Sequence, residues 1–435
     1  MAQSTISISE NPAKTANGPR TPKPLRVLVV HRYFWPDVAP VATILRAICD
    51  RFADQGHDVT VFTSQPCYKP ELKKEQQPWR EDLGRLHVRR CRLIPERSRN
   101  PIVRLLNFAM FLFRAMWHVF FRARKYDLVI SLSFPPIVSG ALIGRAAKLR
   151  GSRYLYHIMD LHPESARFAG KLSNGFVYRI ARWLDGRTCR FADDVVVLSA
   201  DMERTLRSRP GLSNLRNVSV IANFNIPDYN ASETPVVPVE LVKVPGKYRL
   251  IFAGNLGHFQ ALDNVVAAAR LLANRSDIEF VFLGEGAAKK SLIQQAGDAL
   301  DRTIRFFPHQ PVAVCDQLMA GADLGIVSLT QGIIQVANPC KTSSYLSLGL
   351  PTLVIVEEDS ELFRVTEATG IGYSCPPNNP ERLRDTVLRA FAERESATAK
   401  RSKAKRFADE NLTQEVLLEK WESLISKIAG QWEAN

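Results

Sequence analysis

Short runs of large apolar residues alternate with helical stretches along most of this chain, and the alternation occurs as two separate series. The first series contains the runs 26–30, 58–63, 127–133, 153–158, 194–199 and 218–223, with a helical stretch near 41–55. The second contains 248–254, 278–284, 324–329 and 351–356, with a helix near 262–273. A strand, a helix and a second strand in succession are typical of a βαβ unit with parallel strands. The chain is therefore predicted to fold into two doubly wound α/β domains in tandem.

The predicted boundaries follow from changes in composition. Residues 1–24 are polar and are expected to form a disordered tail rather than a signal peptide, because no long apolar run follows the start. Residues 25–232 are expected to form the first Rossmann-like domain, with Ser199 capping a helix. The Pro- and Val-rich stretch 233–246 reads as a linker, 247–411 as the second Rossmann-like domain, and 412–435 as a C-terminal amphipathic helix.

Positive charge is concentrated in the first half of the chain. The protein has 435 residues and a net charge of +14; residues 25–235 carry 33 Lys and Arg against 19 Asp and Glu, whereas residues 236–435 carry 22 against 24. Such asymmetry favours an anionic partner, either a membrane or a nucleic acid. Nucleic acid is the weaker option, because the basic residues are dispersed and no RNA- or DNA-binding motif is present.

The cysteines give an expectation about the compartment. Seven Cys are scattered along the chain and no pair has C-x2-C spacing, so a zinc ribbon is not expected. Scattered thiols are typical of reduced cysteines, and a cytoplasmic location is predicted.

The segment 101–125 is unusually apolar. Its polar residues recur at helical spacing along one stripe: Arg104, Asn107, Arg114, His118, Arg122 and Lys125. Two readings stay open, a core helix packed on the sheet and an in-plane membrane helix with a basic stripe. A membrane span is disfavoured because Arg114 would be costly in hydrocarbon.

Several motifs, in this order, resemble a known family. The segments 27–68, 253–272 (AGNLGHFQALDNVVAAARLL), 280–292 and 338–355 (NPCKTSSYLSLGLPTLVI) are similar to glycosyltransferase family 4, which has the GT-B fold. The segment 133–166 resembles a subgroup that builds bacterial surface polysaccharides, including fucosamine-transferring and colanic-acid-type enzymes. This resemblance implies two Rossmann-like domains with a cleft between them, a returning C-terminal helix and transfer with retention at the anomeric carbon.

The resemblance places the donor, a UDP- or GDP-sugar, on the second domain. Glycine turns after strands let backbone N–H groups approach a diphosphate, although ordinary tight turns use the same residues. Lys341 is the expected phosphate cation, because Asn255 and Gln260 are neutral where many relatives carry Arg and Lys. The two Glu of the family pattern are replaced by Val336 and Ser344, and Ser343 and Ser344 have helix capping as their alternative role. The expected donor residues are Gly254, Asn255, Leu256, Gly257, Gly284, Glu285, Gly286, His309, Gln310, Lys341, Ser343 and Ser344.

The first domain is expected to receive the acceptor. Tyr33, Phe34, Trp35 and Pro36 follow the first strand, where they would line a lipid or sugar or pack in the core. The segment 157–165 (HIMDLHPES) ends a strand at the edge where open α/β sheets bind ligands. Asp160 matches the family's Asp and is the candidate to orient or deprotonate an acceptor hydroxyl, assisted by His162 and Glu164, while Met159 replaces the family's His. A metal site and an N-cap Asp with solvated neighbours are the alternatives for this cluster.

The predicted function is a glycosyltransferase of surface polysaccharide synthesis that uses a nucleotide sugar and a lipid-linked saccharide acceptor. We expect no metal or other cofactor, a peripheral position on the cytoplasmic face of the plasma membrane, contact with anionic lipid and no nucleic-acid partner. Two alternatives remain. A nucleotide-sugar epimerase would share the fold but needs no membrane, and a non-catalytic GT-B binding protein would explain the missing Glu pair.

Overall fold

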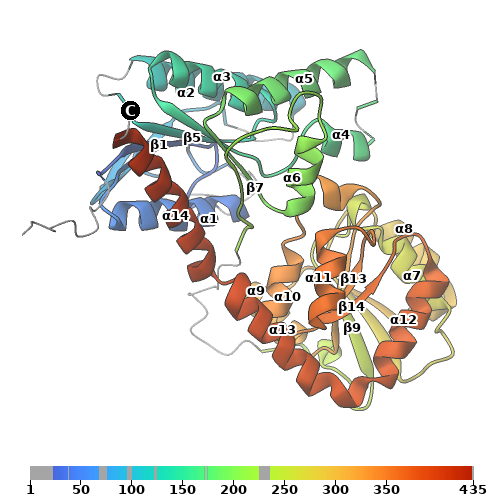
Figure 1. Cartoon of the computed structure of the whole chain (residues 1–435). Helices are drawn as coiled ribbons and strands as arrows, with labels where there is room; N and C mark the ends of the chain where they lie inside the picture. Colours follow the sequence, from blue (N-terminus) through green and yellow to red (C-terminus); the bar gives the residue numbers. More distant parts are fainter. Residues whose placement is uncertain are drawn as a thin grey trace, which may run out of the picture.

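The computed structural model describes residues 23–37, 39–67, 76–95, 100–121, 125–170, 172–173, 175–224 and 236–433. Most of the predicted tail, residues 233–235 of the predicted linker and Arg122 of the apolar segment lie outside these ranges. The described chain forms two sheets, each with helices on both faces (Figure 1). The doubly wound α/β class and the tandem arrangement predicted from the sequence are confirmed.

The first sheet has the strand order β3-β4-β2-β1-β5-β6-β7-β8. Its pairs are parallel except for the antiparallel β3–β4 pair. The strands are β1 (Arg26–Val30), β2 (Asp58–Ser64), β3 (Arg80–Leu83), β4 (Leu86–Cys91), β5 (Leu128–Leu132), β6 (Arg153–His157), β7 (Asp194–Val197) and β8 (Val218–Val220).

The second sheet has the order β11-β10-β9-β12-β13-β14, with all its pairs parallel. Its strands are β9 (Tyr248–Ala253), β10 (Ile278–Leu283), β11 (Ile304–Phe307), β12 (Leu324–Ser328), β13 (Thr352–Ile355) and β14 (Gly372–Cys375). Its helices are α7 (Leu262–Arg270), α8 (Lys289–Ala296), α9 (Val312–Ala320), α10 (Lys341–Ser347), α11 (Glu361–Thr369), α12 (Pro380–Ala392) and α13 (Ala397–Asn411).

Two sets of helices cover the first sheet. On one face α1 (Pro40–Asp54) lies beside α14 (Gln414–Glu433), the last helix of the chain, which returns from the second domain (Figure 1). The opposite face carries α2 (Pro101–Phe121), α3 (Val138–Leu149) and α5 (Phe176–Phe191), with α3 in contact with both neighbours. Two short helices follow strands β6 and β7, namely α4 (Glu164–Phe168) and α6 (Ala200–Arg207).

The strands predicted from apolar runs occur within a few residues of their expected positions, because fully buried parallel strands need continuous apolar sequence. Ser199 caps α6 as predicted, since its hydroxyl accepts a hydrogen bond from the Met202 N–H at 3.2 Å. The hairpin β3–β4 and the strand β14 were not predicted. β3 is largely exposed and polar, the apolar residues of β4 are interrupted by His87, Arg89 and Arg90, and β14 is short, so none of them has an apolar run.

Helix α2 combines features of both readings of the apolar segment. Phe111, Leu112, Ala115 and Val119 are buried in the core of the first domain. The predicted polar stripe is divided: Asn107 is buried, with its amide hydrogen-bonded to the backbone N–H and C=O of Ile94, while Arg104 and Arg114 are exposed. Among the described residues α2 alone is long and apolar enough to cross a membrane by length and composition.

The outer face of α2 is also apolar. Its exposed large side chains are Ile102, Leu105, Leu106, Phe113, Trp117, Phe120 and Phe121. The helix therefore has two apolar faces, one packed in the core and the other exposed to solvent.

The two domains also cap each other's helices. The Glu361 carboxylate accepts a hydrogen bond from the Ala200 N–H at 2.8 Å, at the start of α6. The Asp201 carboxylate in turn accepts from the Glu361 N–H at 3.0 and 3.1 Å, at the start of α11. Since first-turn N–H groups have no partner within their own helix, this exchange satisfies donors on both sides of the domain contact.

Candidate active site

The carboxyl end of β6 in the first sheet meets a loop of the second domain. The Leu161 N–H donates to the Val336 carbonyl oxygen at 2.8 Å. Nearby, Gly332 lies so close to Phe168 that a Cβ atom at this glycine would be 2.3 Å from the phenyl ring. The segments predicted as the acceptor side and the donor side are therefore neighbours at this contact.

Lys341 is placed at the tip of the first strand of the second sheet. It is the first residue of α10, and its Nζ lies 4.8 Å from the centre of the Phe252 ring, at the end of β9. A Cβ atom on Gly254, which has φ of +140°, would lie 2.7 Å from Lys341 Cε. Only a glycine admits both this backbone conformation and the lysine side chain.

The Lys341 ammonium group is largely desolvated, and no carboxylate of the described residues contributes to its electrostatics. Burial lowers the pKa of its ammonium group, and the neighbouring Cys340 thiol acts in the opposite direction. Within the described part of the chain, no carboxylate pairs with Lys341. A desolvated ammonium group without a counter-ion is strongly attracted to an incoming phosphate.

The two glycine turns interlock. A Cβ atom on Gly284 would lie 1.9 Å from the Gly254 carbonyl oxygen, and one on Gly286 would lie 2.3 Å from the Leu256 carbonyl oxygen. The Leu256 N–H donates to the Glu285 carbonyl oxygen at 2.9 Å. These glycines therefore allow close contact between two backbone turns, and this packing fixes the loop next to Lys341.

The other predicted donor residues differ in how far they are exposed. Asn255 is exposed, whereas the Leu256 side chain is buried in the core of the second domain. The Gly257 N–H is occupied by the Gln260 side chain, which accepts its hydrogen bond at 3.2 Å. Glu285 is exposed and forms an ion pair with Lys289 at 2.6 Å.

Ser343 and Ser344 are inside α10 rather than at its N-cap, which is Cys340, so the helix-capping reading of these serines is wrong. Ser343 is buried and lines a cavity of about 220 Å³ between the domains. Ser344 is half-buried and lies three residues after Lys341, which places both on one face of the helix.

His309 and Gln310 follow β11 at the same sheet edge as the glycine turns. The Phe307 carbonyl oxygen at the end of β11 accepts from the Gly284 N–H at 3.0 Å. His309 is exposed, and the Gln310 amide donates to the Pro308 carbonyl oxygen at 3.1 Å. Both residues are thus at the sheet edge that carries the donor loop.

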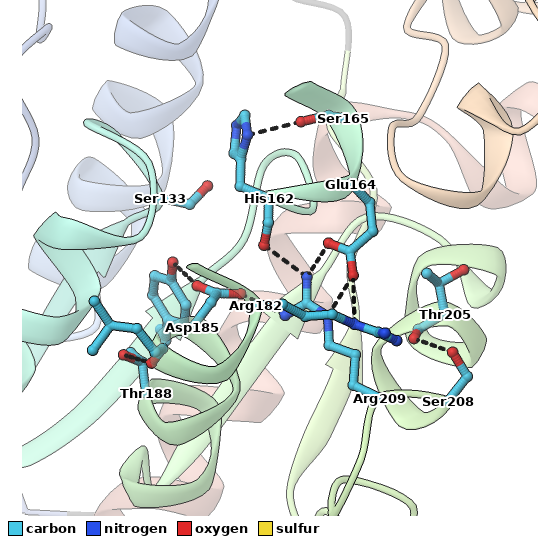
Figure 2. A network of polar contacts seen from close by, with 12 residues as sticks. Ser133, His162, Glu164, Ser165, Arg182, Asp185, Thr188, Thr205, Ser208 and Arg209 are labelled. Carbon is cyan, nitrogen blue, oxygen red and sulfur yellow. Dashed lines mark hydrogen bonds and ion pairs between the residues drawn. The ribbon is translucent and has the colours of Figure 1, made fainter. Parts of the chain in front are cut away.

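Glu164 belongs to a buried ion cluster. Its carboxylate oxygens accept from Arg209 at 2.6 and 3.1 Å, and Arg182 lies 3.2 Å away (Figure 2). Arg209 also pairs with Asp185 at 2.6 Å and donates to the His162 carbonyl oxygen at 2.8 Å. Glu164 therefore holds the loop after β6 in place, and the expectation that it assists an acceptor hydroxyl does not fit this geometry.

The His162 ring is turned away from this cluster and lies 2.8 Å from the Ser165 hydroxyl (Figure 2). Burial lowers the pKa of His162, opposed by the charges of Asp160 and Glu164. Asp160 is exposed. The surrounding chain raises the pKa of its carboxyl by limiting hydration, while His162 acts in the opposite direction. Its carboxylate is near enough to Cys340, the residue before Lys341, to raise the pKa of that thiol. Of the two predicted catalytic carboxylates, that of Asp160 is exposed, whereas that of Glu164 is bound by Arg209.

The side chains of 157–165 do not converge on a common point. His157 is buried against Trp421 with ring centres 5.1 Å apart, while His162 and Glu164 point to Ser165 and Arg209. Among the described residues, no group of three His, Cys, Asp or Glu side chains is arranged to hold a metal ion. The alternative of a metal site in this segment is therefore not supported by the arrangement of the side chains.

The predicted acceptor loop is mostly core. Phe34 is buried with α1 and the first sheet, and Tyr33 packs on Phe134 with ring centres 5.3 Å apart. Trp35 is exposed, with the Arg46 guanidinium 4.9 Å from its ring, and Pro36 is half-buried. Core packing, the alternative reading, therefore accounts for Tyr33 and Phe34, and Trp35 is the large aromatic that reaches the surface.

Arg209 was not anticipated from the sequence. It lies in a Ser-Arg-Pro-Gly turn that matches no motif, 45 residues from Glu164 and 24 from Asp185. The one available signal was the set of acids without nearby bases in the segment 157–165, which requires a distant cation if those acids are buried.

Comparison with known proteins identifies the class. The glycosyl transferase 4-like domain family matches residues 41–224, and the glycosyl transferases group 1 family matches residues 247–393. The chain is 30% identical over 274 residues to the probable glycosyltransferase WbjE of Pseudomonas aeruginosa, covering 60% of this chain and 65% of WbjE. It is 25% identical over 395 residues to the putative colanic acid biosynthesis glycosyl transferase WcaI of Escherichia coli K12, covering 85% of this chain and 96% of WcaI.

Solved structures share the whole architecture. Sucrose-phosphate synthase from Thermosynechococcus elongatus superposes with a TM-score of 0.68 at 15% identity, covering 94% of this chain and all of that one. Anabaena HepE in complex with UDP-glucose has a TM-score of 0.63 at 17% identity, covering 93% of this chain and 100% of HepE. The fold of this protein is GT-B.

Taken with the two family matches, this fold makes the protein a GT-B glycosyltransferase. The chain combines a glycosyl transferase 4-like first domain with a glycosyl transferases group 1 second domain, and one of the relatives that it resembles is named for colanic acid biosynthesis.

Proposed function

We propose that this glycosyltransferase binds a nucleoside-diphosphate sugar on its second domain and transfers the sugar to a lipid-linked saccharide in surface polysaccharide synthesis. The observation that carries the proposal is Lys341, a largely desolvated cation with no partner carboxylate in the described chain, held against the Gly254 turn. The names of the relatives WcaI and WbjE and the UDP-glucose complex of HepE support a sugar nucleotide.

In the proposed reaction the bond between the anomeric carbon and the diphosphate breaks, and the acceptor oxygen forms the new bond to that carbon. Negative charge grows on the leaving diphosphate, where the Lys341 ammonium group and the exposed turn at Asn255 would stabilise it. Asp160 of the first domain, whose charge acts on Cys340 next to Lys341, would orient the acceptor hydroxyl. We propose retention of anomeric configuration, as in the family, and no requirement for a metal because Lys341 supplies positive charge.

Two features support a lipid-linked acceptor, namely the positive charge of the first half of the chain and the exposed apolar side chains of α2. The first half of the chain carries the basic excess, and α2 exposes a row of large apolar side chains beside Arg104 and Arg114. These features support work at the cytoplasmic face of a membrane that holds the lipid-linked acceptor.

The donor site is tested by saturation-transfer NMR with a panel of UDP- and GDP-sugars on the purified protein. We expect one nucleotide sugar to bind and Lys341→Ala to weaken binding at least tenfold, since a charge-assisted hydrogen bond contributes about 1.5–3 kcal/mol. Lys290→Ala, which removes an exposed lysine of α8, is the matched control and should bind normally. Equal affinity of Lys341→Ala and the wild-type protein would show that the phosphates lie elsewhere.

The non-catalytic alternative is tested by product analysis. This alternative is motivated by Val336, which occupies one position of the family's Glu pair. Its side chain is buried and neutral, and its carbonyl oxygen accepts a hydrogen bond from the Leu161 N–H. Binding of a nucleotide sugar without release of nucleoside diphosphate, in the presence of membranes that hold acceptor, would favour this alternative. Conversion of the sugar nucleotide to an epimer without acceptor would instead favour an epimerase.

A further inference from the structure

One layer of three helices, α2, α3 and α5, forms the outer surface of the first domain on this side of the sheet. They pack on the same face of the first sheet, share one core cluster, and lie side by side along the top of Figure 1. Because α3 contacts both α2 and α5, the outward sides of all three form one continuous face, here named the three-helix face.

Helix α5 repeats the pattern of α2 on this face. Its inward residues Tyr178, Asp185 and Cys189 are buried. Its outward residues in the first half are apolar and exposed: Phe176, Val177, Ile180 and Trp183 are between 45% and 69% exposed. A soluble domain rarely leaves such large apolar side chains in rows on neighbouring helices unless the surface binds a partner.

The charges that helices α2, α3 and α5 themselves expose are all positive. The only acid in the sequences of α2, α3 and α5 as described is Asp185, which is buried and bound to Arg209. The basic residues at the surface are Arg104, Arg114, Arg145, Lys148, Arg179, Arg187 and Arg190. Lys148 pairs with Asp193, while the Arg187 guanidinium lies 5.1 Å from the centre of the exposed Trp183 ring.

We propose that the three-helix face docks in the plane of an anionic bilayer, with the apolar rows of α2 and α5 in the interface and the arginines at the phosphate headgroups. Exposed aromatic rings next to arginines suit this depth of a membrane. A second copy of the chain is a poor partner, because self-association would place arginine rows opposite each other. The inference rests on the proposed membrane location and deepens it, since it adds α3 and α5 to the contact and makes α2 lie flat rather than span.

Vesicle binding tests whether α5 contributes to the membrane contact in addition to α2. The double variant Arg179→Gln/Arg187→Gln removes two charges from α5, and Lys290→Gln/Arg302→Gln removes two exposed charges from the second domain as the matched control. Each arginine near an anionic surface contributes about 1 kcal/mol, which is about fivefold in partitioning, so the α5 variant should bind phosphatidylglycerol-containing vesicles roughly 25-fold more weakly. The control should bind like the wild-type protein.

The apolar contribution is measured with Trp183→Ser, for which Leu271→Ser, an exposed leucine of the second domain, is the control. Wild-type binding should fall with added salt, should be weak on pure phosphatidylcholine, and should leave no protease-protected fragment inside the vesicles. Unchanged vesicle binding by both α5 variants, with binding lost when the apolar residues of α2 are replaced, would overturn the three-helix face.

Donor binding by NMR is measured on the same variants, which keeps this inference separate from the proposed enzymatic function. All α5 variants should retain nucleotide-sugar binding and a wild-type melting temperature, because these side chains are exposed. If no nucleotide sugar binds but vesicle binding follows α5, the docking face stands and the proposed donor site fails. If donor binding is normal and no vesicle is bound, the docking face fails alone.

Discussion

Glu164 and Lys341 are two charged residues at the same domain contact, and their neighbours give them different roles. Glu164 is held by Arg209 and Arg182, so its charge is already compensated. Lys341 has a phenyl ring and a glycine turn beside it, so its charge is available to a ligand. At this scale the difference between a structural and a functional charge is the presence of a buried partner.

We predict that Arg209→Met lowers the free energy of unfolding by about 3–5 kcal/mol, because it leaves the buried Asp185 carboxylate without a cation and Glu164 with Arg182 alone. Urea denaturation measures the change, and Arg216→Met, at an exposed arginine, is the control. A Glu164→Gln variant that keeps full stability but loses transfer activity would contradict the structural role given to Glu164.

Two buried histidines predict a pH dependence of stability. Burial lowers the pKa of His31 to about 4 and that of His157 to about 3, and neither nitrogen of His157 has a hydrogen-bond partner in the described chain. The unfolded chain takes up protons below about pH 6.5 while the folded chain does not, so stability is lost as pH falls from 6.5 toward 4.

Each such histidine removes about 1.4 kcal/mol per pH unit below pH 6.5. The His157→Leu variant should therefore show a shallower loss, measured by urea denaturation across this range. An unchanged slope would mean that His157 is protonated in the folded protein.

At the scale of secondary-structure elements, α14 connects the two domains. Its Trp421 is buried between Phe52 of α1 and His157 of β6, with ring centres at 6.3 and 5.1 Å, and Arg51 forms ion pairs with Glu415 and Glu422 of the same helix. The last helix of the chain is thus part of the core of the first domain.

Trp421→Ala should destabilise the protein by about 3–5 kcal/mol, the usual cost of removing a large buried aromatic ring. Thermal unfolding measures the effect, and Trp183→Ala at an exposed tryptophan provides the comparison. If both variants melted alike, α14 would not be docked on the first sheet in solution.

The elements that could be predicted from sequence are those with a local signal. Strands such as β1 and β10 are continuous apolar runs, and the Ser199 cap is a local hydrogen bond. The roles of Glu164 and Tyr33 depended on distant partners, Arg209 and Phe134, which periodicity does not reveal. Lys341 was predicted as the phosphate cation through its motif, and the structure adds what the motif lacked, namely the burial of its side chain and the fit against Gly254.

At the scale of the whole molecule, the reciprocal caps between α6 and α11 join the domains near the cleft. Asp201 and Glu361 each satisfy first-turn N–H groups of the other domain. Because a helix cap contributes about 0.5–2 kcal/mol, this pair is strong enough to bias the domains toward contact and weak enough to open.

The double variant Asp201→Ala/Glu361→Ala should therefore have a larger radius of gyration in small-angle X-ray scattering without a donor. Addition of the bound nucleotide sugar should reduce the difference. An equivalent double change at Asp298 and Asp301, both in the second domain away from this contact, is the control. Identical scattering curves for variant and wild type would show that other contacts set the domain arrangement.

The docking of α14 on the first sheet has a consequence for how the protein is made. The first sheet is complete once residue 220 has been synthesised, yet one of its faces stays uncovered beside α1 until Gln414–Glu433 emerges from the ribosome. While the second domain is translated, the core residues that pack against α14 lack this contact and expose apolar surface. They include Val27, Phe52 and Leu155. For the same reason the first half, expressed without these last twenty residues, should be recovered mainly in aggregates.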